Sequence, residues 1–106
     1  MVWVAGSDQT MTTIEHWDTE EEMILDLRER GFSPHHYTYQ PGTSFPPHTH
    51  EMDKMATVLS GRFRLTMGDG SVVLEKGDGA FVPSGAVHSA EVVGNDPVVS
   101  LDAPRG

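Results

Sequence analysis

The amino-acid sequence predicts an all-β protein with one short N-terminal helix. Two observations lead to this fold class. From residue 35 onward, apolar and polar residues alternate with a period of about two, in short segments rich in β-branched and aromatic residues. Turn-forming residues, mostly Gly, Pro, Asp and Asn, separate these segments at close intervals. Many short strands in this arrangement are typical of an antiparallel sandwich or a closed barrel, not of a parallel sheet.

Length and composition exclude several classes of protein. The 106 residues suit a single domain, and we expect residues 14–106 to form it behind a flexible arm of residues 1–13. The chain has no cysteine, which excludes disulfides and thiolate metal sites. Its 16 acidic and 7 basic residues give a net charge of −9, so we expect no nucleic-acid partner. No signal peptide and no long apolar run is recognisable, so we expect no membrane partner and a cytoplasmic location.

Residues 17–32 predict the helix. Thr19 and Glu22 have the spacing of a capping box, in which each side chain bonds to the other residue's backbone at the start of a helix. Gly31 supplies a stop signal at the other end. The apolar residues that share one face at helical spacing are Met23, Ile24 and Leu27. This face predicts that the helix packs on a larger element.

The strands follow. The Gly-Asp-Gly after Met67 is typical of the tip of a hairpin. Residues 40–47, which contain three prolines and a glycine, are predicted as a turn. The segments predicted as strands, or as parts of strands, are 35–40, 55–60, 62–67, 71–75, 79–83, 87–93 and 97–101.

His48 and His50 form the first candidate for a metal site. In an extended segment, side chains two residues apart point to the same face. Two imidazoles placed in this way can bind one metal ion from adjacent positions. An isolated pair of this kind is a weak signal, because exposed or hydrogen-bonded histidines often have the same spacing.

The wider spacing resembles the two signature motifs of the cupin superfamily, over residues 42–92. The matching positions are Gly42, His48, His50, Lys54 and Gly61 in the first motif, and Gly77, Pro83, Gly85 and His88 in the second. The resemblance implies a small cupin β-barrel, a jelly roll of two antiparallel sheets with the helix across one opening. It also implies that His88 lies across the barrel from His48 and His50, and that the protein forms a homodimer.

Lys54 departs from this family pattern, which has a glutamate ligand at its position. Three arrangements are open. The lysine can swing out of the pocket and pair with Glu51 or Asp53, which leaves a three-histidine site completed by water; we expect this one. It can instead point inward and hold an anionic ligand, with metal weak or absent. Burial can also lower its pKa enough to make it a base or a nucleophile. A second departure, Val92 in place of asparagine, concerns a less consistent position.

Two functions follow from these residues. The first is a metal-dependent enzyme, dioxygenase- or isomerase-like, that acts on a small polar or anionic molecule. His48, His50 and His88 would bind one divalent transition metal, which could be Fe, Ni, Mn, Cu or Zn. The alternative is a non-enzymatic module that binds or senses a small ligand, metal-free and with Lys54 in the pocket. The candidate ligand-binding residues are Lys54, Glu51 and Tyr39. The sequence does not decide between enzyme and binding module, and it identifies no catalytic residue.

Overall fold

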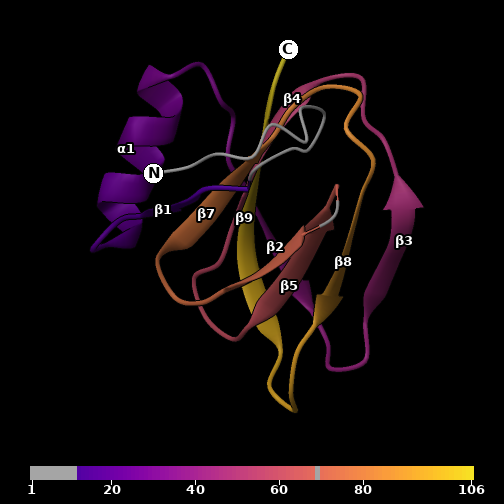
Figure 1. Cartoon of the computed structure of the whole chain (residues 1–106). Helices are drawn as coiled ribbons and strands as arrows, with labels where there is room; N and C mark the ends of the chain where they lie inside the picture. Colours follow the sequence, from indigo (N-terminus) through magenta and orange to yellow (C-terminus); the bar gives the residue numbers. More distant parts are fainter. Residues whose placement is uncertain (1–11, 69) are drawn as a thin grey trace, which may run out of the picture.

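The computed structural model describes residues 12–68 and 70–106, so most of the predicted arm of residues 1–13 lies outside the described residues. Two antiparallel sheets face each other, and the predicted jelly-roll barrel is confirmed (Figure 1). The strand orders are β1-β7-β4-β9-β2 and β3-β8-β5-β6. The elements are β1 (Ile14–His16), α1 (Glu20–Glu29), β2 (His35–Tyr39), β3 (Ser44–His48), β4 (Asp53–Thr57), β5 (Phe63–Met67), β6 (Gly70–Leu74), β7 (Asp78–Val82), β8 (His88–Val92) and β9 (Val98–Arg105).

The main core lies between the two sheets. In β5, Phe63, Leu65 and Met67 are buried, and the residues between them are half-buried, as the alternation in the sequence predicts. β5 and β6 form the predicted hairpin, with Met67 opposite Gly70. The other buried residues of this core are Val58, Leu74, Ala80, Val82, Val92 and Val98.

The helix begins and ends where the sequence predicts. The backbone N–H of Glu22 donates to the Thr19 side chain at 3.1 Å, which caps the first turn. Met23 and Leu27 are fully buried. Among the described residues, no helix is long and apolar enough to cross a membrane.

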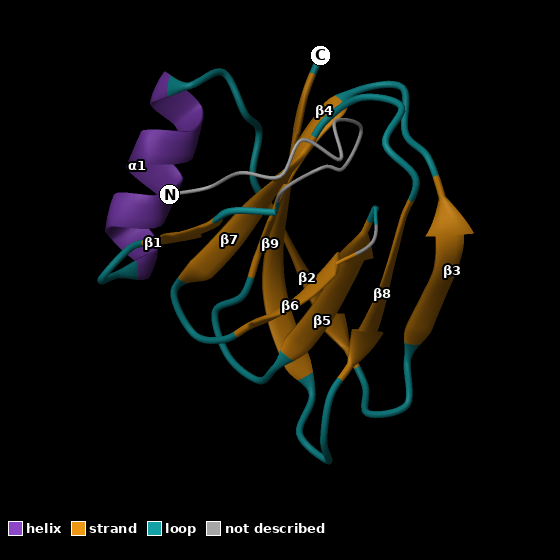
Figure 2. Cartoon of the chain, viewed as in Figure 1, coloured by secondary structure: helices purple, strands orange, loops and turns teal. Residues whose placement is uncertain are grey.

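The expected position of the helix across a barrel opening is wrong. Helix α1 packs on the outer face of the five-stranded sheet (Figure 2). Its apolar side meets Met55 of β4 and Leu101 and Ala103 of β9, whose side chains point away from the space between the sheets. An apolar outer face must be covered, and the helix supplies the cover.

Residues 44–48, most of which the sequence assigns to a turn, form the edge strand β3. Pro46 and Pro47 lack the N–H group that a central strand would need, but an edge strand tolerates their absence. The pairing of β3 with β8 shifts register between Phe45 and His48, so two prolines face one residue of β8. The short strand β1, which pairs with β7, was also not predicted.

Candidate metal centre

The bulge in β3 determines which way His48 points. In a regular strand, residues three apart point to opposite faces. The register shift between Phe45 and His48 removes this alternation, and both side chains line the cavity between the sheets. It also sets His48 directly opposite His88, the first residue of β8. The proline pair therefore positions His48, which the sequence assigned to the metal site mainly through the family resemblance.

His50 follows the end of β3, in the loop that leads to β4. The backbone N–H of Gly85 donates to the His50 carbonyl at 2.9 Å, which ties this loop to the turn before β8. The same turn is held by Asp53, whose carboxylate accepts from the Ser84 backbone N–H at 2.8 Å and, on β9, from Arg105 at 2.9 Å. These two contacts lower the pKa of Asp53. The hydrogen bonds to Gly85 and Ser84 thus join the two segments that carry His50 and His88.

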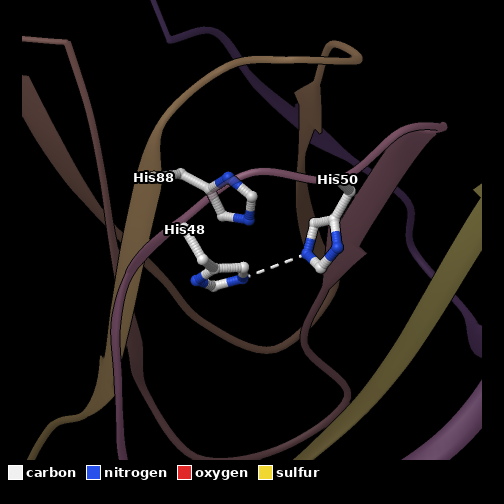
Figure 3. Close-up of side chains that lie close together, drawn as sticks. All are labelled: His48, His50 and His88. Atoms are coloured by element: carbon white, nitrogen blue, oxygen red, sulfur yellow. Dashed lines mark hydrogen bonds between the residues drawn. The ribbon is translucent and has the colours of Figure 1, made fainter.

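The three imidazole rings converge at one point (Figure 3). The ring centres of His48 and His88 are 4.3 Å apart, those of His48 and His50 4.6 Å, and those of His50 and His88 4.9 Å. One nitrogen from each ring lies within 4.8 Å of the other two. Among the described residues, no carboxylate belongs to this cluster.

Hydrogen bonds orient two of the rings. The Nδ1–H of His48 donates to the carbonyl of Pro46 at 2.6 Å, and that of His88 donates to the carbonyl of Ala86 at 2.9 Å. Each bond leaves Nε2 as the nitrogen with a free lone pair, which is the tautomer that a metal ion requires. Burial, and after it the charge of Lys54, lowers the pKa of His50, which favours its neutral form.

These residues fit a transition-metal ion. The Nε2 atoms of His48 and His50 are 3.0 Å apart. Two nitrogens bound at about 2.1 Å to one ion lie about 3.0 Å apart at a right angle and about 3.4 Å apart at the tetrahedral angle. Neutral imidazole nitrogens suit zinc, copper, iron and nickel, and they do not suit calcium or magnesium. The donor set therefore matches the expected class of ion.

The cavity beside the histidines has a volume of about 160 Å³. One wall is aromatic: the centre of the Tyr39 ring lies 5.1 Å from that of Phe45 and 5.5 Å from that of Phe63. Burial and the charge of Asp102 raise the pKa of Tyr39 to about 12, so its hydroxyl keeps its proton. The residues that line the cavity are Tyr39, Phe45, His48, His50, Lys54, Ala56, Phe63, Leu65, Val82, His88, Ala90 and Asp102.

Lys54 lines this cavity, so the expectation that it swings out of the pocket is wrong. Its ammonium group lies 2.8 Å from a carboxylate oxygen of Asp102, and each side chain is 22% exposed. Neither of the two expected partners bonds to Lys54. Asp53 pairs with Arg105, and Glu51 is exposed and is not among the residues that line the cavity. A carboxylate inside the cavity is a nearer partner for Lys54 than either residue on its own segment.

Asp102 is the charged cavity residue that the sequence did not reveal. The predicted strand stopped at residue 101, whereas β9 continues to Arg105. Asp102 lies opposite Ala56 on β4, and Lys54 lies opposite Pro104 on β9, so the pair is diagonal on one face of the sheet. No signal in the sequence identifies it, because β9 is buried on both faces, at Val98 and Ser100 on one face and at Leu101 and Ala103 on the other.

Solved structures with this architecture include the DMSP lyase DddQ of Ruegeria pomeroyi, with a TM-score of 0.64 and 26% identity. That match covers 72% of this chain and 39% of the lyase, so this chain spans less than half of the lyase's length. An uncharacterised protein of Klebsiella pneumoniae with a double-stranded β-helix domain has a TM-score of 0.58 and 28% identity, over 66% of this chain and 63% of that protein.

Sequence comparison points to the same group. An uncharacterised protein of Streptomyces coelicolor is 31% identical over 70 residues, which are 66% of this chain and 67% of that protein. The cupin domain family matches residues 35–104, a range that contains the three histidines and Lys54. With the two sheets and the histidine cluster inside them, this match shows that the chain belongs to the cupin domain family.

Proposed function

We propose that the protein is a metal-dependent enzyme that acts on a small polar or anionic molecule. In this proposal, His48, His50 and His88 hold one divalent transition-metal ion at the end of the cavity. The observation that carries it is the convergence of three imidazoles, two of them held in the ligand tautomer by backbone carbonyls. A structural role alone would not require three adjacent rings around a point next to an open cavity.

When bound, the metal would supply Lewis-acid or redox chemistry. The protein contributes the rest. Three neutral ligands would leave the ion's charge uncompensated and would leave the ion able to bind a further ligand. The cavity of about 160 Å³ suits a small molecule. The aromatic wall of Tyr39, Phe45 and Phe63 would keep bulk water away from the bound molecule.

The reaction class rests on similarity. The DMSP lyase DddQ is 26% identical over most of this chain, and it supports an enzyme with lyase chemistry in addition to the dioxygenase and isomerase classes expected from the sequence. The metal stays open among Fe, Ni, Mn, Cu and Zn, because imidazole ligands suit several of these ions.

A second candidate function is a module that binds a small ligand without turnover. The inward position of Lys54 favours it, because an ammonium group in the cavity can hold an anion with or without a metal. The two functions are distinguished by product formation. Metal-loaded protein is incubated with small carboxylates, and the mixture is followed by NMR. Turnover identifies an enzyme, and unchanged ligand that nevertheless binds identifies a module.

Elemental analysis of tag-free protein tests the metal site. We expect about one equivalent of a transition metal in the wild type and its loss in His50→Ala. His36→Ala is the matched control, because His36 lies on the same chain but is exposed and bonds to Glu20. The proposal fails if the wild type stays empty after incubation with Fe(II), Ni, Mn and Zn, or if both variants lose metal equally.

The homodimer remains an expectation. Strands β2 and β3 end their sheets, and Tyr37 on β2 is exposed. Size-exclusion chromatography with light scattering gives the mass: twice the chain mass supports the dimer, and a single chain mass contradicts it.

A further inference from the structure

We propose that Lys54 and Asp102 select the ligand of this site, which is a small carboxylate held between the metal ion and the Lys54 ammonium group. The inference deepens the proposed function and rests on its metal site. It assigns a role to two charged residues that the three-histidine cluster does not use.

The first support is the place of the pair. Lys54 and Asp102 line the same cavity as the three histidines, from the adjacent strands β4 and β9. The lysine and the histidines border one cavity of about 160 Å³. A molecule that fills the small cavity and contacts the histidines therefore also comes close to the lysine.

The second support is the hydrogen-bonding capacity of Lys54. An ammonium group carries three N–H donors. Within the described part of the chain, the structure gives it one partner, the Asp102 carboxylate at 2.8 Å. The remaining donors can bind oxygens of a ligand. A carboxylate suits this position, since one of its oxygens can bind a metal ion while another accepts from an ammonium group.

The third support is the charge of the site. Asp102 neutralises Lys54, so the pair adds no net charge to the cavity. A divalent ion on three neutral histidines would then keep both of its positive charges, which favours an anionic ligand over a neutral one of the same shape. Asp102 also competes with the ligand for Lys54. Its carboxylate therefore sets how strongly the lysine binds anions.

The test uses malonate, a small dicarboxylate, and malonamide, its neutral analogue of similar shape. The full chain is loaded with Co(II), and binding is followed by the absorption spectrum of the ion and by calorimetry. Lys54→Met should weaken malonate binding by one to two orders of magnitude, which is the usual effect of losing one charge-assisted hydrogen bond. Lys54→Arg should keep most of the affinity. Asp102→Asn should strengthen malonate binding, because it removes the competing charge.

Three controls separate the outcomes. Malonamide affinity should differ little among the variants. Co(II) stoichiometry should be unchanged in Lys54→Met, and thermal melting should show that each variant is folded. A purely structural ion pair would lower the melting temperature in both Lys54→Met and Asp102→Asn and leave malonate affinity unmoved, which overturns the inference.

Malonate binding to the metal-free protein shows whether this inference or the proposed metal site fails. If the wild type binds no metal but binds malonate in a Lys54-dependent way, the metal site fails and the anion-binding role of Lys54 stands. If the wild type binds metal and its malonate affinity is the same in Lys54→Met, the metal site stands and the role of Lys54 is overturned. Malonate binding that depends on Lys54 only in the metal-loaded protein supports both.

Discussion

Lys54 and Asp102 form an ion pair inside the barrel, with 2.8 Å between the ammonium nitrogen and a carboxylate oxygen. The two residues lie on neighbouring strands and are diagonal on the face that lines the cavity. The pair explains how a lysine can occupy the place at which the family pattern has a glutamate ligand. The cavity does contain a carboxylate, but this one comes from β9 and binds the lysine.

Removing one member of this pair should cost more than removing both. In Lys54→Met, the Asp102 carboxylate, which is 22% exposed, stays in the cavity without its partner, and we expect a loss of about 1–3 kcal/mol in the free energy of unfolding. The double variant Lys54→Met/Asp102→Asn should recover much of this loss, since no charge is then left unpaired. Urea unfolding of the metal-free proteins, treated as a double-mutant cycle, gives the coupling. Strictly additive effects would show that the two groups do not interact.

His50 should report the charge of Lys54 directly. Burial is the largest cause of its lowered pKa, and the positive charge of Lys54 comes next. Lys54→Met removes that charge and leaves Asp102, which acts in the opposite direction, so the pKa of His50 should rise. NMR titration of the metal-free proteins measures it, with Lys76→Met as a control for a lysine that does not line the cavity. A His50 titration that stays the same in both variants contradicts the placement of Lys54.

Part of the stability that is lost in acid should come from Asp26. Its carboxylate accepts from the Trp17 ring N–H at 3.0 Å and from Arg30 at 3.0 Å, and these bonds lower its pKa. A group whose pKa is lower in the folded state contributes stability above its unfolded pKa of about 3.9. That contribution is lost as the pH falls through the folded value.

Wild type and Asp26→Asn should therefore differ at pH 7 and converge toward pH 3. Because the carboxylate is partly exposed, we expect a difference of about 1 kcal/mol or less at pH 7. Urea unfolding at several pH values measures it. A difference that is constant over this range would mean that the carboxylate charge does not matter.

The sequence was sufficient for features that depend on local chemistry. The Thr19 cap and the hairpin after Met67 follow from short-range geometry, and both are confirmed. The convergence of His48, His50 and His88 was expected from the family resemblance, and the structure brings the three rings together. Its local cause, the bulge at the two prolines, could not be predicted, because a proline pair is equally typical of a turn.

The position of the helix and the partner of Lys54 depend on contacts between distant segments. Strand β4 carries apolar residues on both faces, such as Met55 outward and Ala56 inward, so its pattern does not show which face the helix covers. Asp102 lies 48 positions after Lys54. Its strand, β9, was predicted to end at residue 101, just before it. Register between strands, and not local propensity, brings these two residues together.

Two glycines with the same backbone conformation should respond very differently to substitution by alanine. Gly42 and Gly61 both have positive φ, at 88° and 83°. A Cβ at Gly42 would meet no atom within 4 Å, whereas one at Gly61 would lie 2.3 Å from the carbonyl oxygen of Pro97.

Gly42→Ala should thus cost only the strain of a left-handed backbone, about 1–2 kcal/mol. Gly61→Ala adds a collision with the backbone of Pro97. This backbone cannot easily move, because Val99, two residues later, exchanges hydrogen bonds with Ser60. We expect a loss of more than about 4 kcal/mol there, or failure to fold. Urea unfolding of the two variants measures the difference. Equal losses would contradict the close approach of the two chain segments at Gly61, since backbone strain alone predicts equality.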